Sequence, residues 1–290
     1  MKIGITAPRG NVGSKIVRRL LEEGSHEIIL LDHRPEKSTE AYGDSVTVVS
    51  CDISDATQLI AATEGLEMLY IVVPPNNGSS TYLQDFIHQG KIFRSAIEVN
   101  DIPRVVFQSS YGAHMPYGTG PIVGLFHAEQ ELNRTAANVV HLRACYFMEN
   151  FLWFKSPIDE KGIIPLPVKS ASTTIYNSTD DIADRAVRWL SSEFWTGKIV
   201  DEIHGQRLSF AEVARLIGNK TGKEVVVVEL SDEQSLEVYT QPHIGFSTHY
   251  AEMFNELHRG VDDGTLTAEF TPNQLSGVNR SFEEFVDATF

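Results

Sequence analysis

Residues 2–34 read KIGITAPRGNVGSKIVRRLLEEGSHEIILLDHR. Ile3 to Thr6 form a short apolar run that predicts a strand, followed by a glycine-containing turn and an amphipathic helix that ends near Gly24. A second apolar run, Glu27 to Leu31, predicts another strand, and it ends at Asp32. This order of strand, turn, helix, strand and acid is typical of a βαβ unit that binds a dinucleotide.

The glycine turn is the part of this unit that would contact a pyrophosphate. Backbone N–H groups at a helix N-terminus bind such an anion, and side chains there would obstruct it. The usual three glycines fall on positions 7, 10 and 13, but position 7 is Ala7, followed by Pro8. Alanine narrows the allowed dihedral angles of the turn, and proline removes one N–H group. Asp32 lies nineteen residues after Gly13, near the position of the acid that binds the adenosine ribose.

Two other interpretations of the turn are weaker. It could start a helix in a sheet protein that binds nothing. Residues 10–15, GNVGSK, also resemble a phosphate-binding P-loop. In that motif the lysine precedes the serine, whereas here it follows, and Pro8 occupies the required first glycine position. We therefore reject the P-loop.

Length and charge exclude several classes of protein. The chain has 290 residues, enough for one large α/β domain or for a domain with an appended lobe. Its net charge of −15 argues against sequence-independent binding to nucleic acid or to an anionic membrane, because both need a basic face. No apolar run approaches the roughly 20 residues of a membrane span, and Met1 leads directly into a strand. We therefore expect a cytoplasmic protein without a secretory signal.

The cysteines and histidines point to no special chemistry. Cys51 and Cys145 both follow strand-like apolar runs, so we expect two buried thiols. The ten histidines show no HExxH spacing and no cluster with cysteine. The sequence therefore predicts no metal site.

Strand and helix signals alternate through residues 1–150, as a parallel sheet with crossover helices requires. Strands are predicted at 46–49, 69–73, 104–107 and 139–142, and helices at 81–99 and 126–134. Residues 151–171 are rich in aromatic side chains and proline, which favours a loop or lid. The ladder is expected to resume with a strand at 173–175 and a helix at 179–190, so that residues of about 172–200 complete the core.

The remaining parts of the chain, 151–171 and 201–290, are expected to form a smaller C-terminal substrate-binding lobe packed on the core. Helix starts in this region are marked by a serine with an acid or amide three residues later, the pattern of a capping box. These pairs are Ser209 with Glu212, Ser231 with Gln234 and Ser281 with Glu284.

Several segments resemble the NmrA-like branch of the atypical short-chain dehydrogenases/reductases, with similarity to members of the triphenylmethane reductase and NAD(P)H quinone reductase type. The segments are TAPRGNVG at 6–13, CDISD at 51–55, YIVVPP at 70–75, VVFQSSYGA at 105–113, HAEQEL at 127–132, LRACYFMENF at 142–151, Asp181-Ile182-Ala183, and Gly264 to Phe285. They follow the order of that family over nearly the whole chain. The resemblance implies an α/β fold with a Rossmann-type doubly wound parallel sheet.

The resemblance also implies an NAD(P)-binding site. Its residues would be Ala7, Arg9, Gly10, Asn11, Val12 and Gly13 in the pyrophosphate turn, Asp32, His33 and Arg34 around the adenosine ribose, Asp52 and Ile53 beside the adenine, Val73, Pro74 and Pro75 along the middle of the cofactor, and Ser109, Ser110, Tyr146 and Phe147 near the nicotinamide. Tyr111 and Met148 would also approach the nicotinamide. Ligands bind at the carboxyl ends of the strands in such sheets, which supports these placements.

The choice between NAD and NADP stays open. Asp32 would accept a hydrogen bond from a free 2′-hydroxyl and repel a 2′-phosphate, which favours NAD. Arg9, His33 and Arg34 could bind that phosphate, which favours NADP.

The usual catalytic pair of short-chain dehydrogenases is absent. In Tyr-x-x-x-Lys the lysine lowers the pKa of the tyrosine, which donates a proton. Here His127 falls at the lysine position and Val123 at the tyrosine position. His127 is a candidate proton donor or an ordinary residue at the start of a helix. Tyr111 is a second candidate donor, or a residue that shapes the pocket.

Two function classes follow, with an isomerase or cyclase on the same scaffold as a minor third. The first is an NAD(P)H-dependent reductase that passes hydride to a small, flat, conjugated acceptor such as a quinone, dye or enone. Its pocket walls would come from Phe147, Met148, Phe151, Trp153 and Phe154, although such a cluster also fits plain core. The second is a non-catalytic redox sensor of NmrA type. The expected partner is a small molecule, with no nucleic acid or membrane, and the protein is a monomer or homodimer.

Overall fold

The computed structural model describes residues 1–192, 194–203, 205–266 and 280–290. Its main element is a seven-stranded sheet in which every pair of neighbours is parallel. In spatial order the strands are β10 (Lys198–Glu202), β6 (Asn138–Ala144), β5 (Arg104–Ser110), β4 (Met68–Ile71), β1 (Lys2–Thr6), β2 (Glu27–Asp32) and β3 (Thr47–Ser50). The order reverses between β1 and β4, and ligands bind at such switch points.

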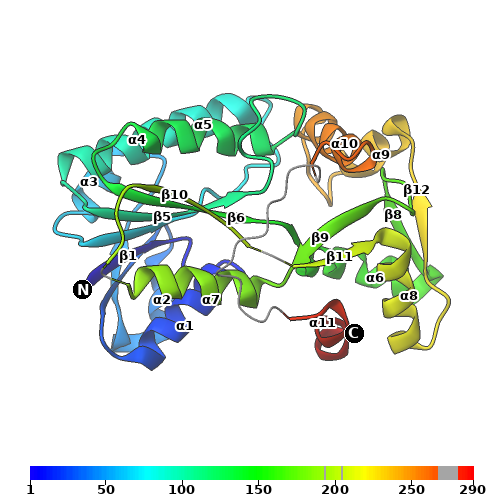
Figure 1. Ribbon diagram of the computed structural model, residues 1–290, viewed down its shortest axis with the longest axis horizontal. Helices are drawn as coiled ribbons and strands as arrows, with labels where there is room; N and C mark the ends of the chain where they lie inside the picture. The colour runs from blue at the N-terminus through cyan, green and yellow to red at the C-terminus, as the bar shows by residue number, and fades with distance from the viewer. Residues whose placement is uncertain (193, 204, 267–279) are drawn as a thin grey trace.

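Helices cover both faces of this sheet (Figure 1). One face carries α1 (Gly13–Glu23), α2 (Pro35–Tyr42) and α7 (Thr179–Leu190), and the other carries α3 (Ala56–Ala62), α4 (Tyr82–Val99) and α5 (Ile122–Asn133). The central strands are apolar on both sides because helices bury both faces. The sheet therefore has two hydrophobic cores, one on each side.

The first βαβ unit is formed as its sequence predicts. Ile16, Val17 and Leu20 are fully buried against the sheet, which fixes the face that α1 presents. Gly24 ends the helix in a left-handed conformation with φ 65°, and its N–H donates to the carbonyl of Leu20. The strands predicted at 46–49, 69–73, 104–107 and 139–142 are confirmed as β3, β4, β5 and β6.

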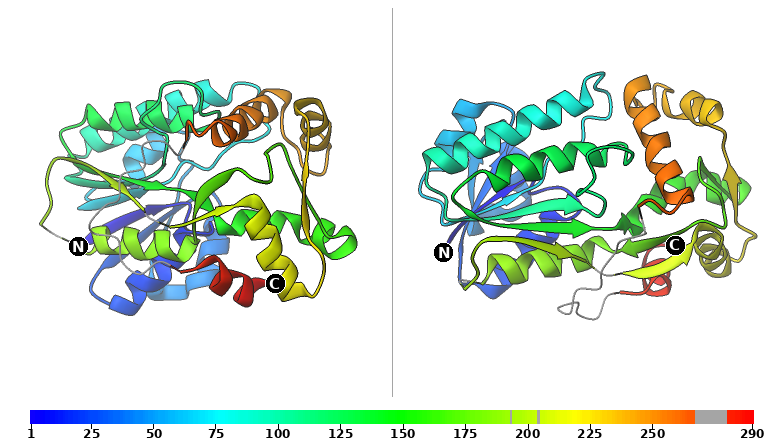
Figure 2. Two further views of the ribbon diagram at one scale, coloured as in Figure 1. Left: turned by 45° about the vertical axis from the view of Figure 1, so that its right-hand side comes forward. Right: turned by 45° about the horizontal axis from the view of Figure 1, so that its top comes forward.

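A smaller part of the molecule lies beyond the carboxyl ends of the strands (Figure 1). It contains β9 (Thr173–Asn177) between antiparallel β11 (Gln206–Ser209) and parallel β7 (Tyr146–Phe147), and a parallel pair of β8 (Ile163–Leu166) with β12 (Val226–Glu229). Its helices are α6 (Lys155–Lys161), α8 (Phe210–Thr221), α9 (Asp232–Tyr239), α10 (Thr248–Asp262) and α11 (Phe282–Thr289). Short 3-10 helices are η1 (Gly43–Ser45) and η2 (Met148–Phe154). Both views in Figure 2 show α11 beside α8, and the two helices are in contact.

Two expectations about this region are wrong. The composition of residues 151–171 favours a loop or lid, but the segment includes most of η2 and all of α6 and β8. The reason is that Ile158, Ile164 and Leu166 are buried in a hydrophobic core, and Pro157 lies in the first turn of α6, where proline is tolerated. The strand near residue 173 does not continue the main sheet, since β9 pairs with β7 and β11 and the main sheet is completed by β10.

Helix boundaries elsewhere agree more closely with the sequence. The helix expected at 126–134 begins earlier, at Ile122, because Ile122 and Val123 are buried. All three predicted capping boxes are present, at the N-termini of α8, α9 and α11. Of the predicted closing segment, Gly264 to Phe285, residues 267–279 lie outside the described residues.

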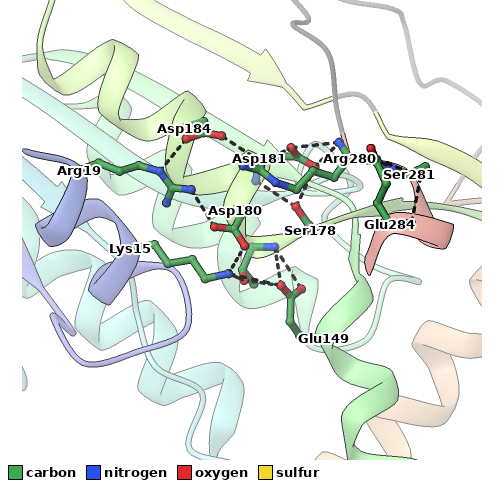
Figure 3. Close-up of polar contacts among 11 residues, drawn as sticks. Lys15, Arg19, Glu149, Ser178, Asp180, Asp181, Asp184, Arg280, Ser281 and Glu284 are labelled. Carbon is green, nitrogen blue, oxygen red and sulfur yellow. Dashed lines mark hydrogen bonds and ion pairs between the residues drawn. The ribbon is translucent and has the colours of Figure 1, made fainter. Parts of the chain in front are cut away.

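A network of ion pairs joins α1 to α7 (Figure 3). Lys15 pairs with Asp180, and Arg19 bridges Asp180 at 2.7 Å and Asp184 at 2.6 Å. The backbone N–H of Thr179 donates to the Glu149 carboxylate at 2.9 Å. These contacts fix α7 against the helix that follows the glycine turn.

The same network holds the start of α11. Arg280 lies two residues before this helix, and its guanidinium contacts Asp181 at 2.8 Å and Asp184 at 3.0 Å (Figure 3). Ser178 donates to the Asp181 carboxylate and caps α7. The end of the chain is therefore attached to the main sheet through α7.

Candidate functional site

A cavity of about 310 Å³ lies at the carboxyl ends of β1, β2 and β3, next to the N-terminus of α1. Its lining residues come from the four segments that the sequence singled out. They are Ala7, Pro8, Arg9, Gly10, Leu31, Asp32, His33, Arg34, Cys51, Asp52, Ile53 and Pro74. The structure thus brings the turn and three strand ends together around one open space.

The backbone of the turn is so tight that two of its positions favour glycine. A Cβ on Gly13 would lie 2.2 Å from the Ala7 carbonyl oxygen, so this position accepts only glycine without movement of the backbone. Ala7 has φ 46°, in the left-handed region that favours glycine. The Gly10 N–H donates to the Ala7 carbonyl at 3.0 Å, and the Tyr42 hydroxyl donates to the Pro8 carbonyl at 2.7 Å. The turn is therefore tight and is held from outside by α2.

The N-terminus of α1 suits an anion. Val12, whose side chain has no acceptor, occupies the N-cap, and the first turn reads Gly13-Ser14-Lys15, without an acid. The positive end of the helix dipole therefore faces the turn with no side chain to neutralise it. The N–H groups of Ser14, Lys15 and Ile16 donate to the carbonyls of Gly10 and Val12, so a pyrophosphate suits the dipole and the N–H groups of residues 11–13, which lie just before them.

Asp32 is the most constrained group in the cavity. Its Oδ2 accepts from Arg9 Nε at 2.6 Å and from Ser38 Oγ at 2.6 Å. Its Oδ1 accepts from Arg9 Nη2 at 3.1 Å and from the Arg34 N–H at 3.0 Å. Burial favours the protonated acid, but the bonds from Arg9, Ser38 and Arg34 outweigh it and lower the pKa of Asp32 to about 2. Asp32 is therefore an ionised and fully bonded carboxylate.

The rest of the cavity rim is polar. His33 and Arg34 are exposed and line the opening. The Asp52 carboxylate accepts from the N–H and the hydroxyl of Ser54, and these bonds lower its pKa. Cys51 is a buried free thiol whose pKa burial raises to about 11. Cys145 is likewise free and buried, which confirms both cysteine predictions.

A second cavity of about 430 Å³ adjoins the first and shares Ile53 and Pro74 with it. It lies between the end of β4 and the N-terminal half of α4, and Val73 lines it. The Gln89 side chain donates to the Ile53 carbonyl at 2.5 Å and fixes this shared wall to α4. Pro75 follows the wall and is exposed.

The two serines at the end of β5 are engaged with the protein. Ser109 is buried and donates to Glu129 Oε1 at 2.6 Å, and Glu129 forms a bidentate pair with Arg143 at 3.0 and 2.7 Å. Ser110 Oγ lies 3.4 Å from the Ala144 carbonyl oxygen. The sequence does not single out Glu129 or Arg143. Both are buried, and their pairing across fourteen positions joins α5 to β6, which no local pattern predicts.

The two candidate proton donors differ in environment. Tyr111 is buried, its hydroxyl lies 3.1 Å from Thr174 Oγ1, and burial raises its pKa. His127 lies on α5, half-buried, with its ring edge-on to Phe126 at 5.2 Å between centroids. His127 is thus the more accessible of the two.

Of the apolar side chains expected to contact the substrate, some are buried in the core and others are accessible. Met148 and Phe151 are fully buried in the hydrophobic core of the smaller part, which argues against direct contact with a ligand. They face inward because η2 packs on the aromatic cluster around Tyr146. Trp153, on the same short helix, is exposed, and Phe147 is half-buried at the end of β7.

The described part of the chain holds neither a metal-binding cluster nor a membrane-spanning helix. Within residues 1–192, 194–203, 205–266 and 280–290, no group of three or more histidine, cysteine, aspartate or glutamate side chains is arranged to hold a metal ion. None of the helices in those ranges is both long and apolar enough to cross a bilayer.

Comparisons with known proteins agree with the geometry. The NmrA-like family model matches residues 1–286. The NAD(P)H azoreductase of Xenophilus azovorans is 24% identical over 283 residues, which cover 96% of this chain and 94% of that protein. The NADPH-dependent quinone oxidoreductase of Escherichia coli, complexed with NADPH, superposes with a TM-score of 0.83 at 21% identity over 99% of both chains. The triphenylmethane reductase of Citrobacter sp., complexed with NADP(H), gives a TM-score of 0.83 at 19% identity, covering 99% of this chain and all of that one. These structures share the fold, and the match of the family model over residues 1–286 shows that the chain belongs to the NmrA-like family.

Proposed function

We propose that the protein is an NAD(P)H-dependent reductase that transfers hydride to a small, flat, conjugated acceptor. The observation that carries the proposal is the cavity at the strand ends, where the glycine turn, the uncapped N-terminus of α1 and two arginines meet. The names of the three similar proteins reported above support this proposal, because they describe reductases of azo compounds, quinones and triphenylmethane dyes.

In this proposal the turn at residues 7–13 binds the pyrophosphate, and the ends of β2 and β3 hold the adenosine. Backbone N–H groups and the dipole of α1 supply the favourable electrostatics. The nicotinamide end is directed past Val73 toward the ends of β5 and β7, where Ser110, Phe147 and His127 are its candidate neighbours. Trp153 stays a candidate for substrate contact because it is exposed.

When bound, a reduced dinucleotide supplies the hydride, so the protein must position the acceptor and exclude water. A quinone or an azo bond that accepts hydride also needs one proton to become the neutral product. A cationic triphenylmethane dye needs none, because hydride alone converts it to the neutral leuco form. We assign the proton to His127, since Tyr111 is buried and bonded to Thr174.

The test is steady-state turnover with NADPH or NADH and three acceptors: a benzoquinone, an azo dye and a cationic triphenylmethane dye. We expect loss of reduced-nicotinamide absorbance with at least one acceptor. With dinucleotide deuterated at both C4 positions, the leuco dye should carry one deuterium at its central carbon. Binding of the dinucleotide without turnover of any acceptor would instead support a redox sensor.

The role of His127 has its own test. His127→Ala should lower kcat with the quinone or azo dye by about tenfold or more, while turnover of the cationic dye and affinity for the dinucleotide stay unchanged. His243→Ala, an exposed histidine in the smaller part of the molecule, is the matched control and should leave all rates unchanged. Equal losses with all three acceptors would show that His127 is not the proton donor.

A further inference from the structure

We infer that the protein selects NADP(H) over NAD(H), that Arg9 determines this choice, and that Asp32 serves to hold Arg9 and does not bind the ribose. The inference rests on the proposed function, because it concerns the dinucleotide cavity described above. It decides between two signals that conflict in the sequence, an acid at the end of β2 and a basic residue in the glycine turn.

The acceptor capacity of Asp32 is already used. A carboxylate has about four lone-pair sites, and four donors occupy them here: two N–H groups of Arg9, the Arg34 N–H and the Ser38 hydroxyl. The Asp32 side chain is only 2% exposed. A 2′-hydroxyl of NAD(H) would have to displace one of these donors to bond with Asp32. The usual reason for NAD preference is therefore absent at this carboxylate.

The charge that would repel a 2′-phosphate is also compensated. Arg9 Nε lies 2.6 Å from Asp32 Oδ2, in a bidentate pair that neutralises the acid directly. His33 Nδ1 lies 3.6 Å from Asp32 Oδ1, and the exposed Arg34 side chain adds a second cation to the cavity lining. Asp52 is the other acid in the lining, and its carboxylate is bonded to Ser54 in its own turn.

Arg9 is placed to bind a phosphate. Its side chain is 25% exposed, and it lines the cavity together with Arg34. Guanidinium carries five N–H donors in a planar fork, and two of them reach Asp32. Asp32 and Ser38 thus fix the orientation of Arg9 before a ligand arrives, which lowers the entropy lost on binding. The N–H groups of Arg9 that do not reach Asp32, together with the Arg34 side chain, match a doubly charged phosphate ester better than a neutral hydroxyl.

The test is calorimetric titration of NADPH and NADH into the wild-type protein, Arg9→Ala and Arg215→Ala. The wild type should bind NADPH at least tenfold more tightly than NADH, and added salt should reduce that ratio. Arg9→Ala should lose most of the preference, because it removes the phosphate ligand and also frees the Asp32 carboxylate for a ribose hydroxyl. Arg215→Ala removes an exposed arginine of α8, far along the chain from the cavity, and should keep the wild-type ratio.

Arg9→Lys serves as the second variant, in case the alanine variant does not fold. It keeps the charge but loses the bidentate fork, so the preference should fall by about threefold or more. Equal or tighter binding of NADH by the wild type, or an unchanged ratio in both Arg9 variants, would overturn the inference while leaving the proposed function intact. Binding of neither dinucleotide by the wild type would instead refute the proposed function.

Discussion

Among the residues that the structure describes, two arginine–aspartate pairs have nearly the same bidentate geometry in different surroundings. In one, Arg9 contacts Asp32 at 2.6 and 3.1 Å, and in the other, Arg185 contacts Asp201 at 2.6 and 3.0 Å. Asp201 is fully buried and Arg185 is 8% exposed, whereas Arg9 lines an open cavity. The same bond therefore lies in the core in one case and beside an open cavity in the other, and this difference in surroundings is the reason why we propose different roles for the two pairs.

The Arg185–Asp201 pair belongs to the fold. It joins α7 to β10, the edge strand of the main sheet, and Trp189 Nε1 also donates to Asp201 at 2.5 Å. These contacts hold α7 against the edge strand of the main sheet. The Arg9–Asp32 pair instead joins the glycine turn to the end of β2, the two segments expected to hold the dinucleotide.

The largest effect is expected when the buried pair is broken. Arg185→Ala removes the charged partner of a fully buried carboxylate, which keeps the neutral Trp189 N–H as a donor, so the free energy of unfolding should fall by about 3–5 kcal/mol. Urea denaturation followed by circular dichroism measures this loss. Arg188→Ala, an exposed arginine on the same helix, should change it by less than about 0.5 kcal/mol. A similarly small loss for Arg185→Ala would show that the two pairs do not differ in this way.

An intermediate effect is expected from the pH dependence of the cavity pair. The pKa of Asp32 is lowered from 3.8 to about 2 in the folded protein. A depressed pKa stabilises the fold above the unfolded value, and this contribution is lost as the pH falls through the folded value. At 1.36 kcal/mol per pKa unit, ionised Asp32 contributes about 2 kcal/mol at neutral pH.

Urea denaturation of the wild type and Asp32→Asn across pH tests this contribution. The difference in the free energy of unfolding should be constant from about pH 7 to 5 and should shrink below about pH 4. Asp44→Asn, an exposed acid in η1, should differ from the wild type by less than about 0.5 kcal/mol at every pH. A difference between wild type and Asp32→Asn that grows as the pH falls would contradict the pairing.

The smallest effect concerns the turn from which Arg9 projects. Ala7 and Asp101 have φ 46° and 49°, the positive values among the described residues other than glycine. Glycine would relieve the strain at position 7 but would gain freedom in the unfolded chain, so Ala7→Gly should stabilise the protein by no more than about 1 kcal/mol. Thermal denaturation measures this change in stability, and Asp101→Gly is the control outside the cavity. A loss of stability would show that the strain at Ala7 is smaller than the entropy that glycine gains in the unfolded chain.

Much of the main sheet could be predicted from the sequence because its signals are local. The glycine turn, the apolar face of α1 and the Gly24 cap lie within one continuous stretch. The NmrA-like resemblance extended the prediction to the strand ends. The capping boxes were equally local, and all three are present.

Other features depend on contacts that no local pattern encodes. Residues 151–171 form regular structure because Ile158 and Ile164 reach a core built from distant segments. The pairing of β9 with β11, and not with the main sheet, is likewise determined by tertiary contacts. Arg9 and Asp32 were both named as cofactor residues, but their mutual bond spans twenty-three positions of sequence and became visible only in the structure.

Hydrogen–deuterium exchange of the protein with and without saturating NADPH tests whether the dinucleotide occupies the cavity at the strand ends. If the dinucleotide occupies the cavity at the strand ends, amide exchange should slow at residues 9–16, 32–34 and 52–54. Slowing at the turn should be the strongest, because its N–H groups would bond to the pyrophosphate. Saturation with NADPH that leaves exchange at these three segments unchanged would contradict the assignment of the cavity as the dinucleotide site.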